Sequence, residues 1–414
     1  MNLNHYAIFG TNFSVKGKLI QQLLKGNPPT ELKELQKKKG LLFSESVLNK
    51  FIEEDYKHGN SALILNKNRS LRTFSSGEKR KALLQYLLSQ EPDFLVLDNP
   101  FDSLDRTSVS DLKLSLQRIS ETTVIIQLFN RKEDLLPFVD SILKVENEQI
   151  VEIFEVSEFQ GNNETNFSEV RNIPPAPVKF QGVPDILVKM KNVSVSYEGK
   201  PVLENISWEI RKGDFWQLTG PNGSGKTTLL SMIYGDNPKA YGVDLYLFGN
   251  KKGSGESVWE IKKKIGYFSP ALTELFNRRN TVLEMLISGL VDSVGLYQKP
   301  GDREIRLAKE WLKTLNLEDK SAKIFTELSE LHKRMVLIGR AMIKHPPLLI
   351  LDEPTTSLDD KSALQITSLI NLIVRESTTA VIFVSHRKEK GLEPKAIYHL
   401  IPSENGSKGE ILVE

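Results

Sequence analysis

Cysteine is absent from the 414 residues, which excludes disulfide bonds, cysteine-ligated zinc modules and iron–sulfur clusters. Long apolar runs are also missing, because stretches such as 380–384 are only as long as a strand and far too short to span a membrane. The first residues, MNLNHYAIFG, show no basic region followed by a long apolar core, so we expect no secretory signal. We therefore expect a cytoplasmic protein, peripheral at the inner membrane face if it has a membrane partner.

A strong charge imbalance is lacking as well. The formal net charge is +2, which gives no electrostatic reason to expect nucleic acid as a partner. With 39% hydrophobic and 26% charged residues the composition is that of an ordinary globular protein. A chain of 414 residues is long enough for two or more domains.

What is present is a phosphate-loop pattern. Residues 220–228, GPNGSGKTT, fit G-x-x-x-x-G-K-[ST] between an apolar run at 215–218 and another at 229–233, which predicts strand, loop and helix. Glycines let backbone N–H groups close around phosphate, Lys226 would reach the β- and γ-phosphates, and the Thr227 hydroxyl would bind Mg²⁺. A glycine-rich turn that matches by chance is the alternative. The predicted ATP-binding residues of the loop are Gly220, Pro221, Asn222, Gly223, Ser224, Gly225, Lys226, Thr227 and Thr228.

The chain contains an internal repeat. LLILDEPTTSLD surrounds Asp352 and FLVLDNPFDSLD surrounds Asp98, and a serine precedes each aspartate by 23 residues, at 329 against 352 and at 75 against 98. Related strands follow, ETTVIIQLFNRKE and STTAVIFVSHRKE. Apolar, β-branched runs alternate with helix-length segments in both halves, which predicts two α/β units with parallel sheets.

The duplication is uneven. In the first half the phosphate loop reads GTNFSVK, with Phe13 and Val15 at the positions of Gly223 and Gly225, and nothing before it matches the strands predicted at 186–210. The middle of the first half is also shorter. We predict a truncated, degenerate domain at 1–153, an extended Pro- and Asn-rich linker at 154–185 and a complete domain at 186–414.

Two carboxylates end the apolar run 348–351. Asp352 would hold Mg²⁺, and Glu353 would polarise the attacking water. His386 follows the next predicted strand and would donate a hydrogen bond to the γ-phosphate. The alternatives are a plain acidic turn and an ordinary surface histidine.

Together these motifs resemble the ATP-binding-cassette (ABC) ATPases over nearly the whole chain. GPNGSGKTT is similar to Walker A, LLILDEP to Walker B with a catalytic glutamate at Glu353, and His386 to the switch histidine. The resemblance places Tyr197 where an aromatic ring stacks on adenine. FSSGEK resembles the signature that contacts the γ-phosphate of ATP held by the opposite domain; its residues here are Ser75, Ser76, Gly77 and Glu78.

The departures in the second-half signature and in the first-half motifs would fall on the same composite site. In the second half the signature positions read Ser-Glu-Leu-His at 329–332. In the first half Gly17, Asn99 and Asn130 replace the Mg²⁺-binding threonine, the catalytic glutamate and the switch histidine, and an amide cannot act as a general base. The family arrangement therefore implies two P-loop NTPase domains in tandem, facing head-to-tail, with one competent site. We expect a monomer whose two cassettes pair within the chain, with ATP and Mg²⁺ as ligands.

Pro270 stands where the family has the Q-loop glutamine, which puts ordinary coupling to a transporter in doubt. Tandem cassettes of this kind are similar to the molybdenum-transport-associated (ModF-type) ATP-binding proteins. One hypothesis is an ATPase that serves transport, with a membrane permease or another protein as partner. The other is an ATP-gated binding module with slow hydrolysis, in stress, DNA repair or at the ribosome. The linker argues against the translation-factor type, and the missing cysteines argue against excision-repair proteins.

Overall fold

The structure is a computed structural model that describes residues 3–9, 13–58, 63, 71, 74–146, 149–159, 172–177, 180–276, 279–296 and 298–412. The chain divides into two compact units, Met1–Thr165 with Ser357–Lys361, and Asn166–Thr356 with Ser362–Glu414. Gly10, Thr11 and Asn12 of the first phosphate-loop sequence lie outside the described residues, as do residues 160–171 and 178–179 of the predicted linker. The domain limits at 153 and 185 stay predictions.

The first unit is built on a six-stranded sheet in the order β2-β3-β4-β1-β5-β6, in which only the β5–β6 pair is antiparallel. Apolar and β-branched residues form its strands, as expected for a sheet buried on both faces. Its elements are β1 (Tyr6–Phe9), α1 (Phe13–Leu24), η1 (Thr30–Leu35), β2 (Gly40–Phe43), α2 (Glu45–His58), α3 (Ser76–Ser89), β3 (Phe94–Asp98), α4 (Arg106–Ser120), β4 (Val124–Phe129), η3 (Lys132–Asp134), β5 (Ser141–Glu146) and β6 (Gln149–Glu155).

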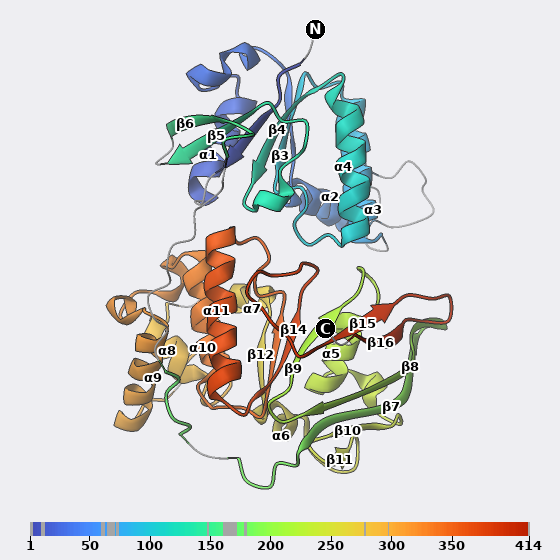
Figure 1. Cartoon of the computed structure of the whole chain (residues 1–414), viewed down its shortest axis with the longest axis vertical. Coiled ribbons are helices and arrows are strands. Elements are labelled where there is room, and N and C mark those ends of the chain that lie inside the picture. Colours follow the sequence, from blue (N-terminus) through green and yellow to red (C-terminus); the bar gives the residue numbers. More distant parts are fainter. Residues whose placement is uncertain are drawn as a thin grey trace. The chain divides into compact units, whose positions relative to one another are not determined.

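Helices cover both faces of this sheet. On one face α1 and η1 pack through residues such as Leu23 and Leu32 onto Ile8 and Ile126. Helices α2, α3 and α4 lie on the other face (Figure 1). Their leucines pack against the alternate strand residues. The sheet is therefore the middle layer of three.

The second unit repeats this sheet strand for strand, in the order β12-β13-β14-β9-β15-β16. The tandem α/β fold predicted from the internal repeat is therefore confirmed. Its elements are β7 (Ile186–Tyr197), β8 (Lys200–Arg211), β9 (Phe215–Thr219), α5 (Lys226–Tyr234), η4 (Pro238–Ala240), β10 (Leu245–Leu247), β11 (Asn250–Lys251), α6 (Val258–Lys263), β12 (Ile265–Phe268), α7 (Pro270–Leu275), α8 (Val282–Ser288), α9 (Asp302–Thr314), η5 (Glu318–Lys320), η6 (Phe325–Glu327), α10 (Glu330–Met342), β13 (Leu348–Asp352), α11 (Asp360–Glu376), β14 (Ala380–Val384), β15 (Ala396–Ile401) and β16 (Lys408–Leu412).

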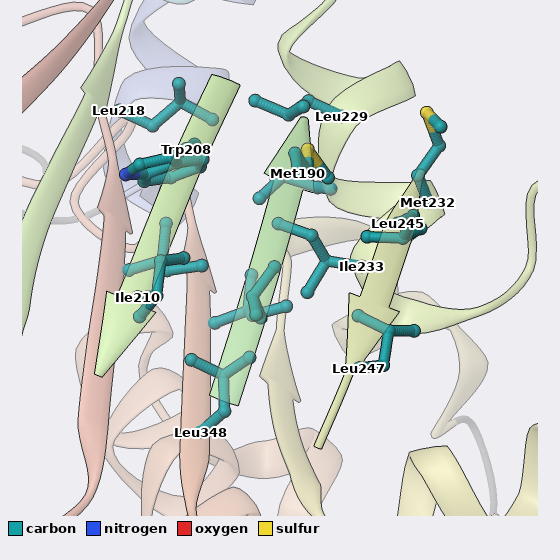
Figure 2. Close-up of a cluster of buried hydrophobic side chains, with 14 of the residues drawn as sticks. Met190, Trp208, Ile210, Leu218, Leu229, Met232, Ile233, Leu245, Leu247 and Leu348 are labelled. Atoms are coloured by element: carbon teal, nitrogen blue, oxygen red, sulfur yellow. The ribbon is translucent and has the colours of Figure 1, made fainter. Parts of the chain in front are cut away.

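A second, antiparallel sheet in the order β11-β10-β7-β8 is added in this unit. Helix α5 lies between the two sheets and is buried through Leu229 and Ile233, in the same cluster as Met190 of the antiparallel sheet (Figure 2). Trp208 of that sheet stacks on Tyr398 of β15, with ring centroids 4.4 Å apart. In the described part of the first unit no such sheet is present, and the truncation of this unit stays a prediction. This double packing fixes the start of α5, where the phosphate loop ends.

Helices α7 to α10 form a lobe between β12 and β13 in the chain, and α8 packs on both α9 and α10. In the first unit α2 and α3 occupy the corresponding stretch. Of the helices that the structure describes, none combines the length and apolarity needed to cross a bilayer.

The end of the predicted linker lies on the second unit. The Ile173 N–H donates to Glu376 Oε2 at 2.9 Å, and the Thr314 hydroxyl donates to the Asn172 carbonyl at 2.9 Å. Pro174 is buried beside them. At the other end, Phe159 packs into the core of the first unit. Both ends of this segment are therefore anchored.

Candidate active site

The phosphate loop of the second unit joins β9 to α5 through glycines in left-handed conformations. Gly223 has φ +80° and Gly225 has φ +90°, and a Cβ on Gly225 would lie 2.7 Å from the Leu203 side chain. Both positions therefore require glycine. The backbone turns into the helix at Gly225, which is the N-cap of α5. Free N–H groups at a helix start and a glycine-rich turn suit an anion.

Polar groups inside the loop fit a phosphate as well. The Lys226 ammonium donates to the Gly220 carbonyl at 2.7 Å and to the Pro221 carbonyl at 3.0 Å. The Ser224 hydroxyl is buried and has no hydrogen-bond partner among the described residues. Pro221 and Asn222 form the partly exposed crest of the loop, and Thr227 and Thr228 lie in the first turn of α5.

The first unit departs from this geometry in its backbone. Helix α1 begins at Phe13, three residues before Lys16, whereas α5 begins at Lys226. The residues that match Gly223 to Gly225 therefore lie in a helical turn instead of a loop. The side chains of residues 13–16 lie outside the described part of the structure, so the role of Lys16 stays a prediction.

Two partly buried carboxylates lie near Lys226 of the loop, at the end of β13. Burial raises the pKa of Asp352, while the nearby Lys226 ammonium opposes this rise. The Tyr267 hydroxyl on β12 lies 3.5 Å from Asp352 Oδ2. Burial raises the pKa of Glu353 to about 7. A carboxylate with a pKa near neutrality is suited to accept a proton at physiological pH.

Glu353 is held from three sides. Its backbone has φ +50°, a conformation that only the surrounding contacts maintain, and its N–H donates to the Val384 carbonyl at 3.0 Å. The Thr356 hydroxyl donates to Glu353 Oε2 at 2.8 Å. Nε2 of His386 lies 3.3 Å from Glu353 Oε1. Because β13 and β14 are parallel neighbours, their carboxyl ends bring the glutamate and the histidine together.

Tyr197 ends β7, is 37% exposed as a residue, and has its hydroxyl hydrogen-bonded. The Asn237 amide donates to that hydroxyl at 2.8 Å and to the Ser231 hydroxyl on α5 at 2.9 Å. The ring is thus tied to the helix that carries the phosphate loop. Adenine stacking stays a prediction.

The sequence motifs do not identify Tyr267 and Asn237, which the structure places at the site. Tyr267 packs on Tyr234 of α5 with ring centroids 4.7 Å apart, so it spans from the phosphate-loop helix to Asp352. Asn237 stands in the sequence GDNP directly after α5, and Gly followed by Pro is a helix-stop signal that predicts a capping residue there.

The signature residues of the first unit form the start of α3. Ser75 is the N-cap and its hydroxyl accepts from the Glu78 N–H at 3.2 Å, while the Glu78 carboxylate accepts from the Ser75 N–H at 2.7 Å. Ser76 is the first residue of the helix. A Cβ on Gly77 would lie 2.7 Å from the Ser108 hydroxyl on α4, so this glycine has a packing reason of its own.

The matching residues of the second unit, Ser329 and Glu330, have different side-chain partners. The Ser329 hydroxyl lies 2.9 Å from Nδ1 of His332, and the Glu330 carboxylate pairs with Lys333 at 2.9 Å. Asn99 of the first unit has φ +44°, and its amide donates to Asp98 at 3.1 Å. Pro270 is the first residue of α7. Whether one composite site is competent and the other is not stays a prediction.

Comparison with known proteins gives a consistent result. The family described as "ABC transporter" matches residues 203–356. The "ABC transporter ATP-binding protein ModF" of Escherichia coli (strain K12) is 36% identical over 345 residues, which cover 80% of this chain and 70% of that protein. An uncharacterized ABC transporter ATP-binding protein of Schizosaccharomyces pombe (strain 972 / ATCC 24843) is 33% identical over 334 residues, 78% of this chain and 66% of that protein.

Among solved structures, the "Model of ribosome-bound archaeal Pelota and ABCE1" superposes with a TM-score of 0.65 at 17% identity, over 99% of this chain and 75% of the other. A second structure, of a complex of archaeal ribosomal stalk protein aP1 and archaeal ribosome recycling factor aABCE1, gives 0.61 at 17% identity. At this identity the likeness shows the fold alone.

Proposed function

Since the chain belongs to the family of ABC ATP-binding proteins, which hydrolyse ATP, we propose that it does so at one composite site. The second unit supplies the phosphate loop, the two carboxylates and His386. The first unit supplies the N-terminus of α3, with Ser75 and Gly77. The observation that carries the proposal is the contact between Glu353 and His386 at the edge that holds the phosphate loop, because Asn99 stands in place of the glutamate in the first unit.

The chain's own residues account for the hydrolytic step. Glu353 would accept the proton of a water whose oxygen forms a bond to the γ-phosphorus, and the bond to the bridging oxygen would break. His386 would donate a hydrogen bond to the γ-phosphate, and its contact with Glu353 keeps the two groups on one side of that phosphate. Thr227 and Asp352 would hold Mg²⁺, which when bound would offset the phosphate charge.

ATP would be bound by the phosphate loop and by the ring of Tyr197. Lys226 lies on two loop carbonyls and would exchange them for β- and γ-phosphate oxygens. Tyr197 would stack on adenine, since Asn237 holds its hydroxyl and the residue is partly exposed. Ser224, buried without a partner among the described residues, would donate to a phosphate oxygen.

For the output of hydrolysis we propose a transport-associated ATPase at the cytoplasmic side of a membrane, because the relative with 36% identity is the ABC transporter ATP-binding protein ModF. The alternative is an ATP-gated binding module with slow turnover, which Pro270 in the Q-loop position favours. A turnover number separates the two. A pull-down from the host with Glu353→Gln, which should trap the ATP-bound state, would identify the partner.

The composite site is tested by one substitution made at two matched positions. Ser75 and Ser329 are both N-caps, and aspartate caps a helix as well as serine does, so Ser→Asp adds a negative charge at little cost in stability. Ser75→Asp should lower kcat about 100-fold or more and leave ATP affinity nearly intact, since it opposes the γ-phosphate. Ser329→Asp should change kcat little. The reverse outcome would contradict the composite arrangement.

A further inference from the structure

A buried arginine follows the signature serine of the first unit by five positions. Arg80 lies on α3 and is 7% exposed. One nitrogen of its guanidinium donates to the Pro100 carbonyl, and the other donates to the Asp102 carbonyl at 2.6 Å and pairs with Glu45 at 3.1 Å. Arg80 thus ties α3 to the loop after β3 and to the start of α2.

The same contact recurs in the second unit. Arg334 follows Ser329 by five positions, is 6% exposed, and donates to the Pro354 carbonyl at 2.9 Å. Pro100 and Pro354 both stand two residues after the aspartate that ends the strand. In both halves the serine and the aspartate are separated by the same number of residues. In both units an arginine of the helix after that serine donates a hydrogen bond to the proline carbonyl of the loop after that aspartate.

The strand-end loop of the first unit has the same backbone conformation as that of the second unit, but it lacks the glutamate. Asn99 and Ser103 have φ values of +44° and +58°, and the matching Glu353 and Ser357 have +50° and +64°. Left-handed backbone at non-glycine residues persists only where surrounding contacts maintain it. Yet Asn99 provides no carboxylate, so the residue that matches Glu353 cannot accept a proton here.

We propose that Arg80 is a positioning residue which uses the Pro100–Asp102 loop to orient the signature residues Ser75 and Gly77. The strand-end loop of the first unit then serves as an anchor for α3 instead of a catalytic element. This inference rests on the proposed function, in which those residues meet the γ-phosphate.

The chemistry of the contact calls for arginine. Its planar guanidinium offers several N–H groups in a fixed fork, so it can meet two carbonyls and a carboxylate at once. A lysine ammonium is a point charge on a flexible stem, so it cannot keep both carbonyls in one geometry. Arg80→Lys therefore retains the charge and loses the orientation.

The experiment measures kcat, KM for ATP and nucleotide affinity in the full chain carrying Arg80→Lys. We expect kcat to fall about 10- to 100-fold, because small displacements of a group that contacts the reacting phosphate have effects of this size. Nucleotide affinity should change less than about twofold, since the phosphate loop lies in the other unit. Unchanged kcat would overturn the proposal.

Leu32→Ala is the matched control for stability alone. Leu32 of η1 is fully buried on the sheet face opposite to α3, so its truncation leaves a cavity away from the signature helix. Assayed below the melting temperature of both variants, it should leave kcat unchanged. A fall in kcat equal to that of Arg80→Lys would overturn the proposal, because loss of stability would then explain both.

A double substitution separates this inference from the proposed function. Ser75→Asn keeps the helix cap and removes the hydroxyl. If Arg80 acts through Ser75, adding Arg80→Lys to Ser75→Asn should lower kcat less than it does alone, whereas fully multiplicative losses would overturn the positioning role. If Ser75→Asp and Ser75→Asn both leave kcat unchanged, the composite site itself is wrong. If they lower kcat and Arg80→Lys does not, only the inference about Arg80 fails.

Discussion

Replacement of Glu353 by glutamine should remove a pH-dependent loss of stability from the second unit. Burial raises the pKa of this carboxyl from 4.5 to about 7 in the folded chain. Below pH 4.5 the group is protonated in both the folded and the unfolded state, so it contributes no penalty. Between pH 4.5 and 7 the unfolded state ionises while the folded state still holds its proton, so the free energy of unfolding falls.

The size of this effect follows from the shift. One pKa unit corresponds to about 1.4 kcal/mol, so the difference between 4.5 and about 7 costs the folded unit about 3 kcal/mol once the pH exceeds 7. Glutamine has nearly the same shape, stays neutral at every pH and can still accept from the Thr356 hydroxyl. The variant should therefore match the parent only below about pH 4, differ by less than about 1 kcal/mol at pH 5, and exceed the parent by about 3 kcal/mol at pH 8.

Tryptophan fluorescence offers a selective assay, because all four tryptophans, Trp208, Trp216, Trp259 and Trp311, belong to the second unit. Urea unfolding of both proteins without nucleotide and with a chelator, from pH 5 to 8, gives the difference in free energy. A difference that stays constant with pH, or one in which the variant is the less stable protein at pH 8, would refute the reasoning. Thr356→Val removes a hydrogen bond that lowers the pKa of Glu353, so it should extend the pH dependence to higher pH.

Three further predictions concern ATP. Lys226→Ala should abolish hydrolysis and weaken nucleotide binding in a titration, while Lys16→Ala should change the rate little; equal damage would contradict a single competent site. Tyr197→Ala should weaken ATP binding by about 1–2 kcal/mol, as for loss of an aromatic stack, whereas Tyr197→Phe keeps the ring and should cost less; calorimetry would show whether the ring matters at all. Because Pro270 replaces the Q-loop glutamine, ATPase activity should not respond to a permease that couples through that residue, and stimulation by such a permease in vesicles would show the opposite.

The fold and the phosphate loop could be predicted because their signals are local. The glycine spacing in GPNGSGKTT and the repeated strand-end sequences each specify a short segment without reference to distant residues. The first turn of α3 likewise closes on itself through the capping pair Ser75 and Glu78, three residues apart in the sequence. Here the local pattern and the tertiary structure coincide.

Other features depend on contacts between residues far apart in the chain, and no pattern within a segment reports them. Tyr267 looks like an ordinary strand residue until β12 pairs with β13 and brings it beside Asp352. In the sequence GEKRKA, Arg80 is one of several charged residues. In the structure it is buried, and it donates hydrogen bonds to the carbonyls of Pro100 and Asp102, 20 and 22 residues away. Gly77 was assigned a role toward phosphate, and its close approach to Ser108 is a second reason for glycine that only the packing reveals.

The anchored segment between the two units has a consequence for how the protein responds to dilution. From Phe159, packed in the first core, to Asn172, held on the second unit, the chain advances 13 residues, which can span at most about 45 Å in any conformation. Each unit is therefore confined near the other at an effective concentration in the millimolar range. Pairing of the two cassettes, as proposed, would be a unimolecular event, so the specific ATPase activity should not depend on protein concentration even at nanomolar levels.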